Sequence, residues 1–133
     1  MTDPQTPPSD HLAAGMRVRR EVLGDAHVDR SMAAVSEFAR PVQELVTEYC
    51  WGEVWTREGL DRRTRSLLNL AMLTALGRNH ELAVHVRGAV TNGATVTEIQ
   101  EALLQTAVYC GVPAALESFR VADGVLAELA DAD

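Results

Sequence analysis

The chain has 133 residues, which is enough for one domain with a sizeable buried core. Its 12 basic and 19 acidic residues give a net charge of −7, which argues against nucleic acid and anionic membranes as partners, because phosphate contacts need basic side chains. Apolar residues make up 47% of the chain, so an intrinsically disordered body is excluded, and the absence of Lys excludes Schiff-base chemistry.

Residues 1–8 are polar and rich in Pro, and we predict a disordered tail there, followed by one domain over residues 9–133. This start lacks the basic and apolar stretches of a signal peptide, and the longest apolar run is about half a membrane span, so a soluble, cytoplasmic protein is expected. Cys50 and Cys110 have neither zinc-site nor C-x-x-C spacing. We expect buried free thiols, and a single disulfide stays open as the alternative.

Helical periodicity predicts an all-α domain of about seven helices with short connections. The predicted helices cover residues 10–23, 31–39, 41–51, 61–76, 79–91, 97–109 and 113–130. Gly24, Gly77, Gly93 and Gly111 follow helices and are the expected stop residues, and Asp61 is placed to open the fourth helix.

Four segments carry more specific expectations. Residues 25–30 are predicted as a connection, and W-G-E-V-W over residues 51–55 as a short irregular segment, while T-x-x-Q over residues 97–100 has the pattern of a capping box. The helix over residues 61–76 contains S-L-L-N-L-A-M-L-T-A-L, which is apolar on nearly all sides. Such a helix is central or lies at a subunit interface, so we expect a homo-oligomer.

The main candidate for chemistry is R-N-H-E-L-A-V-H-V-R over residues 78–87. Glu81 and His85 are four residues apart on one helix face, so the carboxylate can orient the imidazole, and Arg78 on the same side can hold an anion. The alternative is an ordinary surface pair of Glu and His. His80 lies five residues before His85 on a different face, so no metal site is expected.

A second candidate is the group of Arg62, Arg63 and Arg65 at the start of the helix over residues 61–76. Positive charges there oppose the helix dipole, which indicates a compensating ligand or partner. The alternative is a solvated first turn paired with Asp61 and Glu58.

Several stretches, taken together, resemble the carboxymuconolactone decarboxylase family. They are G-M-R-V-R-R-E-V-L-G (15–24), W-G-E-V-W (51–55), D-R-R-T-R-S-L-L (61–68), L-G-R-N-H-E-L-A-V-H-V-R-G-A (76–89), N-G-A-T-V-T-E-I-Q-E (92–101) and Y-C-G-V-P-A-A (109–115). The likeness runs from about Gly15 to Glu128. Alkylhydroperoxidase-like members of the wider superfamily carry C-x-x-C before the motif His, where this chain has R-N-H-E, so a thiol peroxidase is not expected.

The resemblance implies a helical subunit of the alkylhydroperoxidase-D-like type in a ring-like homo-oligomer, expected to be a hexamer, with sites near subunit interfaces. It implies decarboxylation of 4-carboxymuconolactone to β-ketoadipate enol-lactone in the degradation of aromatic compounds such as protocatechuate. The ligand is then a small dicarboxylate lactone. Its own conjugated carbonyl accepts the electrons left by CO2, so no cofactor is expected.

For this reaction His85 is the expected general acid or oxyanion donor, and Glu81 is its orienting partner. Arg65, Arg78 and Arg87 are candidates for binding the substrate carboxylates.

The W-G-E-V-W motif adds Trp51 and Glu53 as substrate-binding candidates. Trp residues four apart, such as Trp51 and Trp55, are more often anchors of a core or of a subunit interface than part of a substrate site. The alternative functions are a lyase or isomerase acting on another small carboxylated lactone, and a non-catalytic helical oligomer.

Overall fold

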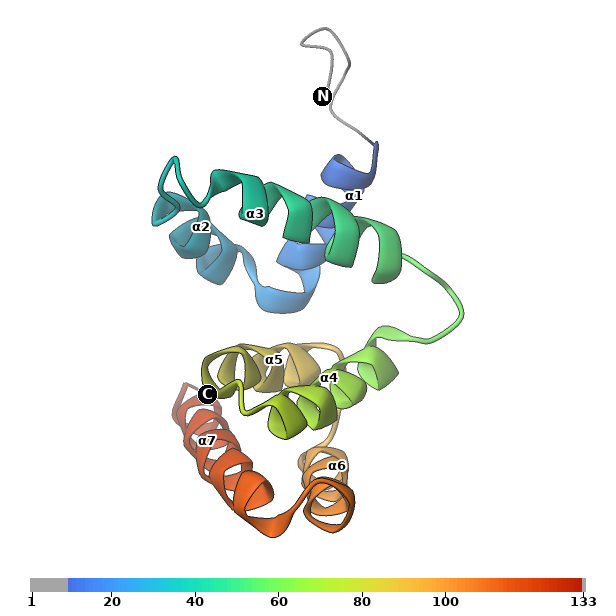
Figure 1. Cartoon of the computed structure of the whole chain (residues 1–133), viewed down its shortest axis with the longest axis vertical. Coiled ribbons are helices and arrows are strands. Elements are labelled where there is room, and N and C mark those ends of the chain that lie inside the picture. Colours follow the sequence, from blue (N-terminus) through green and yellow to red (C-terminus); the bar gives the residue numbers. More distant parts are fainter. Residues whose placement is uncertain (1–9, 133) are drawn as a thin grey trace, which may run out of the picture. The chain divides into compact units, whose positions relative to one another are not determined.

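The structure is a computed structural model that describes residues 10–132. The tail predicted over residues 1–8 lies outside the described residues. The described residues form helices joined by short connections and hold no strand, which confirms the all-α prediction. It divides at Gly59 into two compact units, which the sequence did not indicate. We call residues 10–59 the N-terminal unit and residues 60–132 the C-terminal unit (Figure 1).

The N-terminal unit consists of α1 (Asp10–Leu23), α2 (Asp25–Ala33), α3 (Arg40–Leu45) and the π-helix η1 (Val46–Val54). The first helix is as predicted. The prediction of a connection over residues 25–30 followed by a helix over residues 31–39 is wrong, because α2 begins immediately after Gly24 and ends at Ala33. Gly24 has φ 90°, which turns the chain, and its carbonyl accepts the first hydrogen bond of the new helix from Val28.

The irregular segment predicted over residues 51–55 is also wrong, because helical structure runs through Val54. The wide turns of η1 continue directly from α3, and the Trp55 amide still donates to the carbonyl of Cys50, five residues earlier. Before α3, the Ser36 hydroxyl accepts a hydrogen bond from the amide of Ala39. This side-chain cap holds a turn where the sequence pattern predicted a continuous helix.

Two glycines let α1 lie directly against η1. A Cβ atom on Gly15 would overlap the carbonyl oxygen of Thr47, and a Cβ on Gly52 would overlap the carbonyl of His11. Beside this contact, Trp51 and Trp55 pack with their ring centroids 4.7 Å apart and form a small core with Val18 and Val22 on α1. The backbone contact therefore fixes how α1 covers the two indoles.

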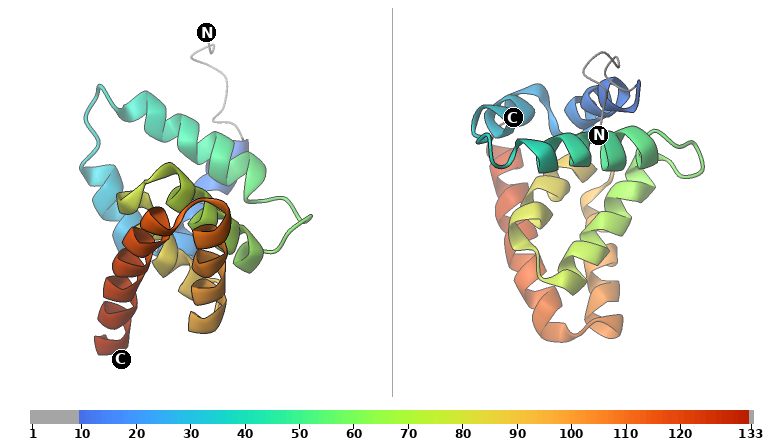
Figure 2. Two further views of the ribbon diagram at one scale, coloured as in Figure 1. Left: turned by 60° about the horizontal axis from the view of Figure 1, so that its bottom comes forward. Right: turned by 45° about the horizontal axis from the view of Figure 1, so that its top comes forward.

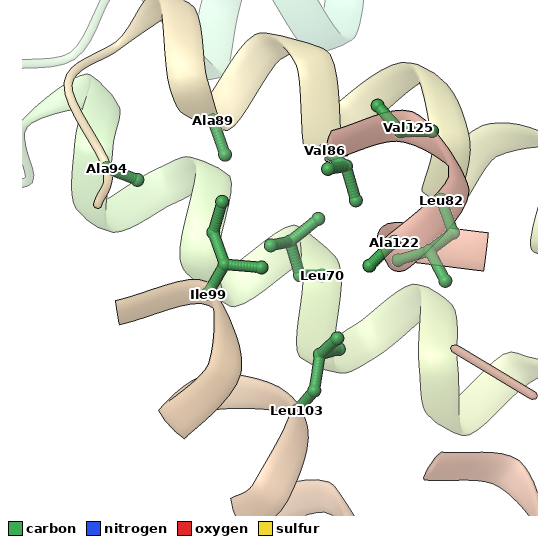
Figure 3. Close-up of a cluster of buried hydrophobic side chains, with 9 residues drawn as sticks. All are labelled: Leu70, Leu82, Val86, Ala89, Ala94, Ile99, Leu103, Ala122 and Val125. Atoms are coloured by element: carbon green, nitrogen blue, oxygen red, sulfur yellow. The ribbon is translucent and has the colours of Figure 1, made fainter. Parts of the chain in front are cut away.

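The C-terminal unit consists of α4 (Arg62–Leu76), α5 (Asn79–Thr91), α6 (Val96–Tyr109) and α7 (Val112–Asp131), close to the predicted helices. In it α4 packs on α5 and α6, and α7 packs on α5 and α6 (Figure 2). Each helix contributes to one apolar core (Figure 3). The buried core side chains are Leu70, Leu82, Val86, Ala89, Ala94, Ile99, Leu103, Ala122 and Val125.

Side chains at the helix ends explain where α4 and α6 begin. Asp61 is the N-cap of α4, as predicted, and accepts a 2.7 Å hydrogen bond from the amide of Thr64. The capping box of α6 is Thr95 with Glu98, so the predicted box over residues 97–100 is wrong by two residues. Thr95 is extended, with ψ 159°, as an N-cap must be, and it satisfies the amide of Glu98.

The contact of α1 with η1 predicts opposite effects for two Gly→Ala substitutions. Gly15→Ala should lower the free energy of unfolding by about 1 kcal/mol or more, because the added methyl group overlaps the backbone at Thr47. Gly124→Ala on α7, where a Cβ has no neighbour within 4 Å, should raise it by about 0.5–1 kcal/mol. Chemical denaturation of both variants measures this, and equal stabilisation by both would contradict the close contact.

The N-cap of α4 predicts an acid-dependent stability. Hydrogen bonds from the side chain and then the amide of Thr64, together with the charge of Arg63, hold the pKa of Asp61 below its usual range. Its stabilising contribution is therefore complete above about pH 4 and is lost as pH falls through the lowered pKa. Asp61→Asn keeps a capping side chain without the titration. The stability difference between wild type and this variant should shrink on acidification, and a constant difference in pH-resolved urea unfolding would contradict the assignment.

Candidate functional site

The candidate site lies along the contact between α4 and α5, which run antiparallel. Two side-chain contacts cross it: the Asn92 amide donates to the hydroxyl of the fully buried Ser66 at 2.9 Å, and Asn69 Nδ2 lies 3.4 Å from His85 Nδ1. Residue order is reversed between the two helices at these contacts. These four polar residues lie in a line at the margin of the apolar core, which we call the seam: Ser66, Asn69, His85 and Asn92.

His85 sits half-buried on α5 next to Val86, which is fully buried in the core. This packing fixes the rotation of the helix, and Asn69 on α4 then meets one ring nitrogen. When the amide donates to Nδ1, the neutral ring carries its proton on Nε2. An imidazole in that tautomer can donate a hydrogen bond or a proton to a bound molecule through Nε2.

Asn69 is the residue that sequence reasoning missed. It was visible as a polar residue inside the apolar run of the helix over residues 61–76, one turn after Arg65. Arg65 is half-buried on the same face of α4, and its Nε atom is shielded from solvent. The structure therefore gathers Arg65, Asn69 and His85 in one unit, on two packed helices.

The other candidate residues of the 78–87 motif, Arg78, Glu81 and Arg87, lie at the surface. Arg78 is the exposed N-cap of α5, and Glu81 is exposed one turn before His85. The orienting contact of Glu81 with His85 stays a prediction. Arg87 forms an ion pair with Glu128 on α7, which supplies it with a counter-ion from within the unit.

Acidic side chains accompany the Arg group at the start of α4. Arg63 forms an ion pair with Glu98 in the first turn of α6, and Asp61 caps the helix. The charge of Arg63 also acts on Asp61, as the alternative of a turn paired with acidic residues predicted, and Glu98 is an additional partner that the sequence did not indicate.

Trp51 and Glu53 belong to the N-terminal unit. Trp51 is 4% exposed and serves that unit's core, as the alternative interpretation of the Trp pair predicted, whereas Glu53 is exposed. The cysteines are free, with Cys50 half-buried and Cys110 exposed, so the expectation of buried thiols is wrong for Cys110.

Over residues 10–132, no three His, Cys, Asp or Glu side chains lie close enough together to hold a metal ion. None of the described helices combines the length and the apolar character that crossing a membrane needs.

Comparison with known proteins identifies the family to which the chain belongs. The pattern of the carboxymuconolactone decarboxylase family matches residues 40–124, which include α4 and α5 with the seam. A nitrosuccinic acid decarboxylase of Metarhizium robertsii is 44% identical over 117 residues, or 88% of this chain and 82% of the relative.

Two further relatives are named 4-carboxymuconolactone decarboxylase. The protein of Acinetobacter baylyi is 43% identical over 115 residues, or 86% of each chain. The protein of Pseudomonas putida is 50% identical over 40 residues, which are 30% of this chain and 83% of the relative. The Metarhizium and Acinetobacter matches are long enough to include parts of both units of the chain.

The contact of Asn69 with His85 predicts a single ring tautomer. In neutral His85 the proton should reside on Nε2, because Nδ1 accepts from the Asn69 amide. Nitrogen NMR of the imidazole distinguishes the two tautomers directly. Asn69→Asp, which offers only acceptors, should move the proton to Nδ1, and the matched variant Asn92→Asp at the other end of the seam should not. A ring that carries its proton on Nδ1 in the wild type would contradict the assignment.

Proposed function

Because the chain belongs to the carboxymuconolactone decarboxylase family, we propose that it decarboxylates 4-carboxymuconolactone to β-ketoadipate enol-lactone in the catabolism of aromatic compounds. The observation that carries this proposal is the half-buried His85, held by Asn69 within the region matched to the family. A cytoplasmic location goes with this proposal.

The reaction requires the protein mainly to position the substrate. The substrate is a γ-lactone that bears one carboxylate on the ring carbon and a second on an acetate arm. Loss of CO2 leaves an electron pair on the ring carbon, and the conjugated double bond passes it to the lactone carbonyl to form a dienolate. Protonation then gives the enol-lactone. Because the lactone is its own electron sink, the reaction needs no cofactor.

The residues of the seam suit the remaining tasks. His85 supplies a hydrogen-bond donor for the charge growing on the lactone oxygen, or the proton that ends the reaction. Asn69 is a positioning residue that holds the ring. Arg65 and Arg78 are the candidates for holding the acetate carboxylate, while the pairing of Arg87 with Glu128 makes it a weaker candidate.

Nitrosuccinic acid is a second candidate substrate, favoured by the 44% identity to the Metarhizium decarboxylase. The two substrates share their reacting part. In each, one carbon bears the departing carboxylate, a carboxymethyl arm and a group that draws in electrons, which is the nitro group or the unsaturated lactone. A site that binds the retained arm and donates to the oxygen of the electron sink fits both. Assays with each compound separate them.

We also propose that the chain assembles into a homo-oligomer, expected to be a ring-like hexamer. On α4 the exposed apolar residues Leu68, Met72 and Leu76 recur every four residues, so they form a stripe on one face. Beside this stripe a cavity of about 340 Å³ lies between α4 and α6, lined mainly by apolar groups. Exposed apolar surface of this kind marks an interface between subunits more often than a monomer surface.

The proposed reaction predicts distinct effects at two residues. With 4-carboxymuconolactone as substrate, His85→Gln should lower turnover by about 10²–10⁴, the range for loss of a general acid. Glu81→Gln should lower turnover less and shift the pH–rate profile toward lower pH, because a neighbouring carboxylate favours the imidazolium. Absorbance assays of turnover measure both. Near wild-type turnover of His85→Gln would remove His85 from the site, and an inactive wild type would contradict the proposed substrate.

The apolar stripe predicts the response of the assembly to a single charge. Light scattering of the wild type should give a mass several-fold above the 14.5 kDa of one chain. Met72→Glu should lower that mass, because a carboxylate buried at an interface is strongly unfavourable. Val96→Glu, an equally apolar and exposed position at the start of α6, should leave the mass unchanged. A monomeric wild type at micromolar concentration would contradict the proposed homo-oligomer.

A further inference from the structure

Arg19 on α1 is a charged side chain enclosed in the N-terminal unit, with 6% of its surface exposed. Its hydrogen bonds go to neutral groups: Nη1 donates to the Thr47 hydroxyl at 3.1 Å, and Nη2 donates to the Gln43 side-chain carbonyl at 3.1 Å. Nη1 also lies 3.8 Å from the sulfur of Met32. Its Nε is buried and has no hydrogen-bond partner among the described residues.

The acidic residues of α2 form ion pairs with Arg20, the residue after Arg19, and not with Arg19. Arg20 lies nearer the surface and pairs with Asp29 at 2.9 Å and with Asp25 at 3.3 Å. These hydrogen bonds, to Asp29 and then to Asp25, raise the pKa of Arg20. Burial, and secondarily the positive charge of Arg20, lower the pKa of Arg19. Arginine nevertheless keeps its proton in proteins, so a buried positive charge stands here without a carboxylate partner in the described chain.

Such a charge is unfavourable unless something balances it. Removing a guanidinium from water costs several kcal/mol, and hydrogen bonds to neutral groups offset only part of this. A buried group that is costly to the fold is typical of a binding site, where a ligand supplies the missing interaction. The placement of Arg19 therefore indicates an anion that belongs beside it.

The donors that remain match a carboxylate. A guanidinium has five N–H donors, and here three acceptors face them, one of which is a weak thioether. Nε and Nη2 lie on one edge of the guanidinium plane, which can bind the two oxygens of a carboxylate in parallel. One carboxylate also neutralises the single charge, whereas a doubly charged phosphate would leave a buried negative charge.

The structure also indicates the side from which such an anion reaches the guanidinium. The hydrogen bond to Thr47 is fully buried, whereas the contacts with Met32 and Gln43 are only partly buried. These two residues flank the non-helical connection of residues 34–39 between α2 and α3. A ligand that arrives there and binds the edge formed by Nε and Nη2 displaces the Gln43 side-chain carbonyl, which is a neutral acceptor.

We propose that Arg19 is the binding residue for a carboxylate of a small molecule in the N-terminal unit. The inference does not depend on the reaction proposed above, and its test uses no turnover. Succinate, which offers two carboxylates and no reactive group, is the probe. Acetate and inorganic phosphate serve as comparison anions.

The test measures the thermal unfolding temperature of the full chain over a succinate titration. Wild type should be stabilised by succinate and less by phosphate at equal ionic strength. Arg19→Met should lose this response, and without ligand it should unfold at the same or a higher temperature than wild type, because the buried charge is gone. Arg20→Met removes an equal charge from the paired neighbour, and it should keep the succinate response.

Arg19→Lys tests the same proposal if Arg19→Met fails to fold. It keeps the charge but loses the planar fork, so its titration midpoint should rise at least about tenfold, which corresponds to ~1.4 kcal/mol. An unchanged succinate response in either Arg19 variant would overturn the proposal, as would a wild type that succinate does not stabilise. A stabilisation by phosphate equal to that by succinate would overturn the choice of a carboxylate. A lowered oligomer mass of Arg19→Met with an intact succinate response would assign Arg19 to a protein contact instead.

Discussion

The antiparallel packing of α4 on α5 is the constraint on which the candidate site depends. Leu70 from α4 and Leu82 and Val86 from α5 are fully buried in one core, so neither helix can rotate without exposing apolar surface. With both rotations fixed, the polar residues at the margin have one arrangement. Asn69 then meets His85, and the ring is held by a contact that the helix of His85 alone could not provide.

Charge is handled differently at the surface and in the interior of this protein. Arg20, Arg63 and Arg87 each have an acidic partner, although exposed ion pairs of this kind contribute little to stability. Arg19 is buried, where a partner would matter most, and its contacts are neutral. This distribution is the reverse of what stability alone favours, which is why it is informative about binding.

The relatives suggest why a small helical chain can serve more than one decarboxylation. Two proteins of similar identity to this chain carry different substrate names, nitrosuccinic acid and 4-carboxymuconolactone. In both compounds the electrons left by CO2 move to an oxygen atom of the substrate itself. Under the proposed function, the seam between α4 and α5 is the place where this chain orients a carboxylate and sets a donor near that oxygen.

The sequence by itself determined the helical class, the limits of α1, α4 and α5, and the stop at Gly77, because these depend on periodicity and caps within a few residues of one another. It misplaced α2, η1 and the cap of α6, where Ser36, the contact at Gly15 and Thr95 decide the local structure. The partners of His85, Arg87 and Arg19 came only from the tertiary structure. They lie on other helices, at sequence separations of 16, 41 and 28 residues, and no local pattern encodes which side chains meet across such distances.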